Sequence, residues 1–94
     1  LTDARRGARG GTDTSHDGAI RLRPPDGLSA RTANGIADLS GIATVLGEVS
    51  IPERALLDGL VFDGPIRAVL LVENLGAWRD LSPPPGWLLA HVPG

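Results

Sequence analysis

The longest apolar run of the chain covers residues 66–72, and only Arg67 interrupts it. An Asp-Gly-Pro turn at residues 63–65 precedes the run, and a polar Glu-Asn pair follows it. A continuous apolar segment of this length, bounded by turn residues, is typical of a strand buried on both faces, as in a parallel sheet. We therefore expect a central parallel strand at this position.

A helix and a second apolar strand are expected after this run. Leu75, Trp78 and Leu81 recur at every third position, which places them on one helical face. The proline-rich segment 82–86 ends this helix, and residues 87–92 form a second apolar run. A strand, a short helix and a strand in succession predict two parallel neighbouring strands joined by a crossover. The fold class we expect is α/β, with a small, partly parallel sheet, a βαβ unit at its C-terminal end and the core at residues 66–92.

Weaker patterns come before this unit. Alternating apolar and polar residues predict a strand at residues 19–23. Spaced apolar residues indicate a short helix within residues 28–39, and a β-branched run indicates a strand at residues 42–46. The S-x-x-E spacing that begins at Ser50 is that of a capping box, which predicts a helix that ends at Gly59.

The composition limits the chain to one small domain. It has 94 residues with 13 Gly and 8 Pro, and its formal net charge is −2. Residues 1–18 are rich in Gly, Arg and Asp and poor in apolar residues, which predicts a flexible arm or linker before a single small α/β domain at residues 19–94. The chain has no cysteine, which excludes disulfides and thiolate metal sites. We expect no membrane contact and a cytoplasmic location, because neither an apolar span of membrane length nor a signal-peptide pattern is present.

Glu73 is the main candidate for chemistry. It directly follows the apolar run, at the carboxyl end of the expected parallel strand, where ligands of open α/β sheets bind. A carboxylate in such a crevice can bind a hard cation such as Mg²⁺ or move a proton. The alternative is that Glu73 is only the first solvated residue after the strand.

Nucleic-acid contact could come from the N-terminal segment. Arg5, Arg6 and Arg9 lie close together there, and flexible arginine-rich arms bind phosphate backbones without sequence specificity. The alternative is a solvated tail. Trp78 and His91 are expected to belong to the core rather than to a binding site.

The pattern from Val69 to Leu75, with its Glu-Asn pair and the following Trp78, resembles the opening of a Toprim domain. It is most similar to the Toprim subunit of Wadjet-type plasmid-defence systems and its uncharacterised bacterial relatives. The resemblance covers residues 66–94. It implies a Mg²⁺-dependent DNA-cleaving or topoisomerase-like protein, with DNA as a partner and with Glu73 as catalytic acid/base or metal ligand.

The resemblance is incomplete at the metal site. The family also requires an Asp-x-Asp pair after a later strand, and Asp80 is the only acidic residue that follows Glu73 here. The resemblance therefore implies the front part of a larger domain, inactive alone, with Mg²⁺ bound only in a complete parent protein.

A second hypothesis is non-catalytic. A small α/β domain with two apolar strands needs something to cover the edges of its sheet. The chain would then be an interaction or self-association module, and a protein partner or a homo-oligomer would cover these edges.

Overall fold

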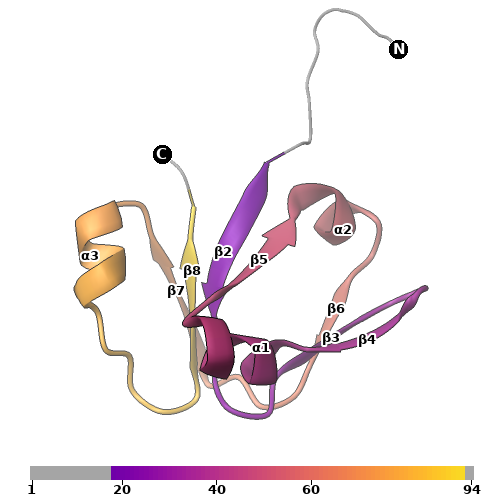
Figure 1. The fold of residues 1–94 in the computed structure, drawn as a ribbon, viewed down its shortest axis with the longest axis horizontal. Coiled ribbons are helices and arrows are strands. Elements are labelled where there is room, and N and C mark those ends of the chain that lie inside the picture. Colours follow the sequence, from indigo (N-terminus) through magenta and orange to yellow (C-terminus); the bar gives the residue numbers. More distant parts are fainter. Residues whose placement is uncertain (1–17, 93–94) are drawn as a thin grey trace, which may run out of the picture.

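The computed structural model describes residues 18–92, which form two β-sheets and three helices (Figure 1). The arm expected at residues 1–18 lies, apart from Gly18, outside the described residues. The strands are β2 (Ala19–Arg23), β3 (Ser29–Thr32), β4 (Gly35–Asp38), β5 (Val49–Pro52), β6 (Val61–Asp63), β7 (Ala68–Val72) and β8 (Trp87–His91). The helices are α1 (Leu39–Leu46), α2 (Glu53–Leu57) and α3 (Leu75–Asp80).

The larger sheet has the strand order β5-β2-β8-β7 and mixes both strand directions. Strand β2 pairs antiparallel with both β5 and β8, whereas β7 and β8 are parallel, in a register from Ala68–Trp87 to Val72–His91. Helix α3 connects the two parallel strands. The fold is therefore α/β with a partly parallel sheet and a βαβ unit at the C-terminal end, as the sequence predicts.

The smaller sheet has the order β4-β3-β6, and its first two strands form a hairpin. The helix predicted within residues 28–39 is wrong. Thr32 pairs with Gly35 across a two-residue turn, and Gly35 has a φ of 139°, which glycine adopts readily. The turn itself consists of Ala33 and Asn34, and the turn-forming residues Asn34 and Gly35 outweigh the helix-like spacing of the apolar residues.

Helix α1 occupies the segment where the sequence pattern predicts a strand at residues 42–46, and that prediction is wrong. The side chain of Asp38 caps the helix by accepting a hydrogen bond from the Gly41 N–H at 3.0 Å. Gly47, with a φ of 90°, ends it in the left-handed region. Both ends therefore satisfy free backbone groups, which compensates for the low helix propensity of the β-branched residues between them.

Helix α2 confirms the helix predicted before Gly59 but not its capping box. Ser50 lies in strand β5, and the residue at the N-cap of α2 is Pro52, with no side-chain hydrogen bond. Ser50 belongs to the strand because the next residue, Ile51, is buried and pairs with Ile20 of β2. Strand β6, which the sequence pattern does not predict, pairs with β3.

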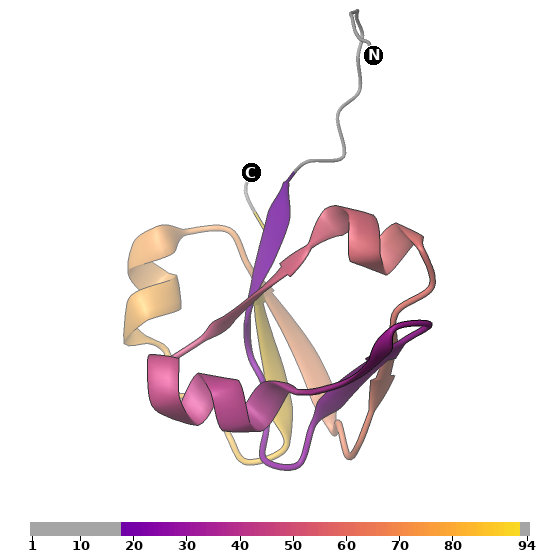
Figure 2. The same ribbon diagram turned by 45° about the vertical axis from the view of Figure 1, so that its right-hand side comes forward.

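Two apolar clusters hold the fold together, one on each face of the larger sheet. The alternating residues of β8 divide between them, because Leu88 and Ala90 belong to one cluster and Leu89 to the other. Helices α1 and α2 lie on the side of the smaller sheet, and α3 lies on the opposite side (Figure 2). The buried residues of the first cluster are Leu22, Leu28, Ala30, Leu39, Ile51, Leu88 and Ala90. The core therefore extends well beyond residues 66–92, where the sequence pattern places it.

Strand β7 is an edge strand, and the prediction that it is buried on both faces is wrong. Its burial alternates: Leu70 and Val72 face the cluster under α3, whereas Val69 is 54% exposed and Leu71 is 65% exposed. The smaller sheet and its helices pack on Leu22 of β2 and on Leu88 and Ala90 of β8, and they leave this outer end of the sheet uncovered.

Candidate functional site at the β7 edge

The residues that carry the candidate chemistry lie around strands β7 and β8. Glu73 occupies the two-residue connection between β7 and α3 and is exposed. Its neighbour Asn74 is the N-cap of α3, and the Asn74 Oδ1 accepts a hydrogen bond from the Ala77 N–H at 2.8 Å. The Glu-Asn pair thus ends the strand and begins the helix, and Glu73 lies at the carboxyl end of a parallel strand, where the sequence places it.

A metal site needs more than one such carboxylate. Within residues 18–92, no three His, Cys, Asp or Glu side chains lie together in a way that could hold a metal ion. Glu73 therefore has no set of companion ligands in the described part of the chain. Mg²⁺ binding stays an expectation that rests on the Toprim resemblance.

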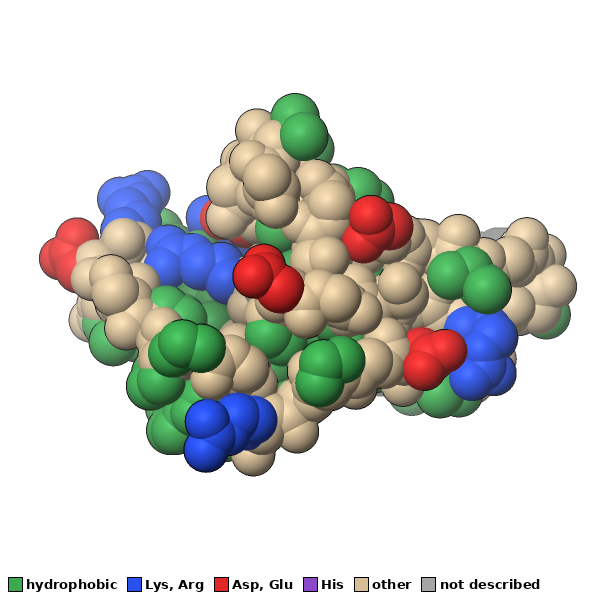
Figure 3. Space-filling view, turned by 90° about the horizontal axis from the view of Figure 1, so that it is seen from below, with side chains coloured by type: hydrophobic (Ala, Val, Ile, Leu, Met, Phe, Trp, Pro, Cys, Tyr) green, Lys and Arg blue, Asp and Glu red, His purple; other side chains and the backbone are tan. Residues whose placement is uncertain are grey.

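The second predicted site is the arginine-rich N-terminal segment, which was expected to contact nucleic acid. Arg5, Arg6 and Arg9 lie outside the described residues. On the face of the domain drawn in Figure 3, acidic and basic side chains are interspersed among hydrophobic ones, and neither sign of charge forms a continuous patch. This face has no basic surface of the kind that binds a nucleic-acid backbone.

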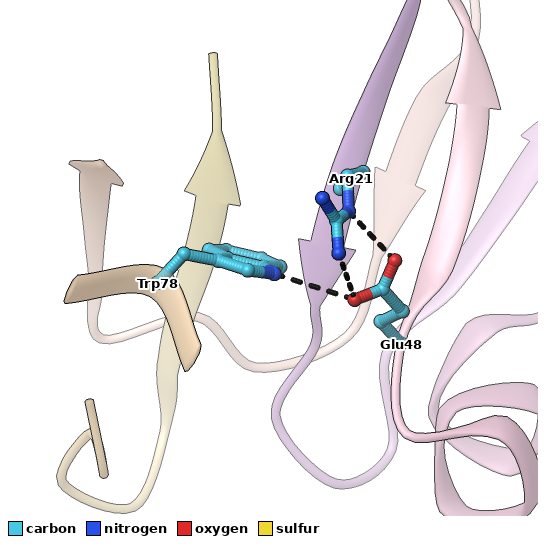
Figure 4. A network of polar contacts seen from close by, with 3 residues as sticks. All are labelled: Arg21, Glu48 and Trp78. Atoms are coloured by element: carbon cyan, nitrogen blue, oxygen red, sulfur yellow. Dashed lines mark hydrogen bonds and ion pairs between the residues drawn. The ribbon is translucent and has the colours of Figure 1, made fainter. Parts of the chain in front are cut away.

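A polar cluster that the sequence does not reveal connects α3 to the sheet. The Trp78 side chain is completely buried, as expected for a core residue, and its indole Nε1 donates a hydrogen bond to the Glu48 Oε1 at 3.3 Å (Figure 4). The guanidinium of Arg21 donates to both carboxylate oxygens of Glu48, at 2.7 and 2.9 Å. Helix α3, strand β2 and the residue before β5 therefore meet at one carboxylate.

The same tryptophan ring contacts two arginines. The guanidinium carbon of Arg23 lies 4.6 Å from the Trp78 ring centroid, and that of Arg21 lies 5.7 Å away. His91, half-buried on β8, contacts the ring at a centroid distance of 5.7 Å. These contacts combine a cation–π attraction with the packing of the arginine stems on an aromatic surface.

Arg21 and Glu48 form the ion pair of this cluster. The hydrogen bonds from Arg21 and, secondarily, from Trp78 hold the pKa of Glu48 below its usual value, and the same carboxylate raises the pKa of Arg21. A carboxylate that stays ionised and accepts three hydrogen bonds is a poor proton carrier near neutral pH. We interpret the Trp78 cluster as a structural device that fixes α3 on the sheet.

The free edge of β7 is the feature of this region that a partner could recognise. In the described part of the chain, no strand pairs with β7 on the side away from β8. Its exposed Val69 and Leu71 lie on the face of the sheet that carries a wholly apolar cavity of about 210 Å³. The cavity is lined by Ile20, Leu22, Ile51, Leu56, Phe62, Ile66, Val69, Leu88 and Ala90. Unpaired backbone groups and an apolar surface are therefore adjacent.

Comparisons with known proteins identify no relative: no family model, no curated protein and no solved structure matches the chain.

None of the helices within residues 18–92 has the length and apolar character needed to cross a membrane.

Proposed function

We propose that this chain is a protein-interaction module that accepts an added strand at the β7 edge. The exposed edge of β7, with Val69 and Leu71 uncovered beside it, carries the proposal. An extended segment placed there would satisfy the free N–H and C=O groups of the strand and would cover these two side chains. Affinity in this mode of recognition comes from main-chain hydrogen bonds, and specificity comes from alternate side chains.

The other edge strands are better protected against added strands. Strand β5 ends at Pro52, which has no N–H to donate, and β4 ends at the charged Asp38. Strand β6 has three residues and ends at Asp63. Strand β7 has five residues and contains no charge, proline or glycine. Natural proteins use short strands, charges and proline to block edge pairing, so β7 is the edge that is left open to it.

A labelled peptide tests the proposal. Fluorescence anisotropy would measure the binding of a peptide with the sequence of residues 66–73 to the 94-residue chain. We expect saturable binding, because the peptide can extend the sheet beside β7. A peptide with proline in place of Leu70 should bind more weakly, since proline removes a backbone donor and resists a strand conformation.

Two protein variants locate the binding site. Leu71→Lys places a charge on the open edge and should weaken peptide binding about tenfold or more. Val45→Lys is the matched control, because Val45 is 80% exposed on α1, away from the edge. The absence of saturable binding, or equal weakening by both variants, would rule out strand addition at β7.

A second candidate function follows from the Toprim resemblance and is favoured by the parallel β7-α3-β8 unit with Glu73 at its carboxyl end. In this proposal the chain is the front part of a Mg²⁺-dependent DNA-cleaving protein, and Glu73 acts as metal ligand or acid/base. The test is nicking of supercoiled plasmid by the complete protein with and without Mg²⁺. A Glu73→Gln variant should lose Mg²⁺-dependent nicking, and unchanged nicking would refute the role of Glu73.

A further inference from the structure

We infer that the strand added at β7 is the β7 strand of a second copy of this chain, paired antiparallel about a two-fold axis at Leu70. This inference rests on the proposed function and names its partner. The two four-stranded sheets would then form one continuous sheet across the axis. A two-fold interface uses the same surface on both copies, so the strand must be complementary to itself.

The backbone directions of β7 satisfy this condition. The Val72 C=O accepts a hydrogen bond from the Val92 N–H at 3.0 Å, so the Val72 carbonyl is directed toward β8. Bonding directions alternate along a strand, which directs the backbone groups of Val69 and Leu71 toward the free edge. With the axis at Leu70, Val69 of one copy lies opposite Leu71 of the other, and their outward N–H and C=O groups bond each other.

The side chains on the exposed face match in the same register. Val69 and Leu71 are the two uncovered apolar residues of β7, and the two-fold axis places each beside the other type from the second copy. Directly opposed residues of an antiparallel pair have side chains on the same face of the sheet. The pairing therefore covers both apolar side chains with one another.

The charges that flank the strand are complementary in this register. Arg67 lies one residue before β7 and Glu73 one residue after it, at equal distances from Leu70 along the chain. Antiparallel pairing about Leu70 puts Arg67 of each copy opposite Glu73 of the other. Both residues are exposed. The Arg67 N–H already donates to the Gly86 C=O at 2.7 Å, so Arg67 reaches the second copy with its side chain and not with its backbone. A parallel arrangement would put like charges together, which is unfavourable across a strand pair.

A charge-swap series measured by sedimentation equilibrium tests the inference. The wild-type 94-residue chain should show a reversible monomer–dimer equilibrium. Arg67→Glu and Glu73→Arg should each weaken dimerisation about tenfold, because the two-fold axis repeats each like-charge contact. The double variant Arg67→Glu/Glu73→Arg should recover wild-type dimerisation, since it restores opposite charges across the axis.

Arg31→Glu is the matched control, because Arg31 is exposed on β3, the central strand of the smaller sheet. Circular dichroism of each variant checks that the fold is retained. Recovery in the double variant supports the register about Leu70. A chain that stays monomeric at millimolar concentration, single variants equal to Arg31→Glu, or a double variant without recovery would each overturn it. A monomeric chain that still binds the peptide of residues 66–73 would refute self-pairing and leave the proposed interaction function standing.

Discussion

The indole nitrogen of Trp78 and the carboxylate of Glu48 form a hydrogen bond of 3.3 Å across 30 residues of chain. This bond connects α3 to the segment before β5, and Arg21 of β2 completes it from the other side. Helix α3 has only six residues, which is too short to be stable by itself. Its position therefore depends on the buried ring of Trp78 and the groups around that ring.

Replacement of Trp78 by alanine should strongly destabilise the domain. The side chain is completely buried between α3 and the sheet, and truncation of such an aromatic residue costs about 3–5 kcal/mol. Chemical denaturation monitored by far-UV circular dichroism would measure the loss in the free energy of unfolding. Trp87→Ala is the matched control with a half-buried tryptophan, and it should cost clearly less. Equal costs would show that Trp78 does not anchor α3.

Thermal stability should fall in acid partly because of Glu48. Its pKa is lowered in the folded protein, mainly by the hydrogen bonds from Arg21, and returns to the ordinary value on unfolding. A lowered folded pKa gives stabilisation that is present above the unfolded pKa and is lost as pH falls through the folded pKa. Because a third of each side chain of the pair is exposed, solvent screening keeps this contribution modest.

The measurement is the melting temperature between pH 7 and pH 3 for the wild type and for Glu48→Gln. The variant should melt lower than the wild type at pH 7, and the two curves should converge in acid. Asp80→Asn serves as the control, since Asp80 is exposed at the end of α3, and it should keep the wild-type pH profile. Parallel curves for Glu48→Gln and the wild type would contradict the role given to the Glu48 carboxylate.

Capping of α1 can be tested against the capping box that the sequence suggests for α2. Asp38→Ala removes the side chain that accepts the Gly41 N–H, and it should cost about 1 kcal/mol. Ser50→Ala should change the free energy of unfolding very little, because Ser50 is an exposed residue of β5 and caps no helix. Urea unfolding of both variants decides between the two sites. A larger loss for Ser50→Ala would reverse the assignment.

Gly47 should resist replacement for reasons of backbone conformation alone. Its φ is 90°, and a Cβ atom at this position would meet nothing within 4 Å. Gly47→Ala should therefore cost about 1–2 kcal/mol from backbone strain, without a steric clash. Gly18→Ala is the control at a position outside the left-handed region, with one ordinary contact to Glu53, and its effect should be small. Differential scanning calorimetry would separate the two, and equal losses would contradict the strain assigned to Gly47.

Local patterns were sufficient for several elements of the fold. Alternation identified β2, and the apolar runs identified β7 and β8, since each pattern follows directly from strand geometry. The spacing of Leu75 and Trp78 predicted α3, and Gly59 marked the end of the segment that holds α2. The error at residues 28–39 came from apolar spacing that outweighed the turn signal at Asn34-Gly35. The error at residues 42–46 came from a β-branched run that outweighed the caps at Asp38 and Gly47.

The two candidate sites also differ in whether the sequence alone reveals them. Glu73 could be placed from the sequence because the end of an apolar strand is a local feature. The Trp78 cluster could not, because Glu48, Arg21 and Arg23 come from separate elements and meet only when α3 packs on the sheet. No spacing of residues along the chain predicts that these side chains contact Trp78.

By itself, the sequence determined that residues 66–92 form two parallel strands joined by a helix, because periodicity and turn residues act over short distances. The tertiary structure alone decided the strand order β5-β2-β8-β7, and this order places β7 at the edge of the sheet. An apolar strand has the same local pattern in the centre of a sheet and at its edge. Whether Val69 and Leu71 are buried or open to a partner depends on which elements cover that edge, and those elements come from other parts of the chain.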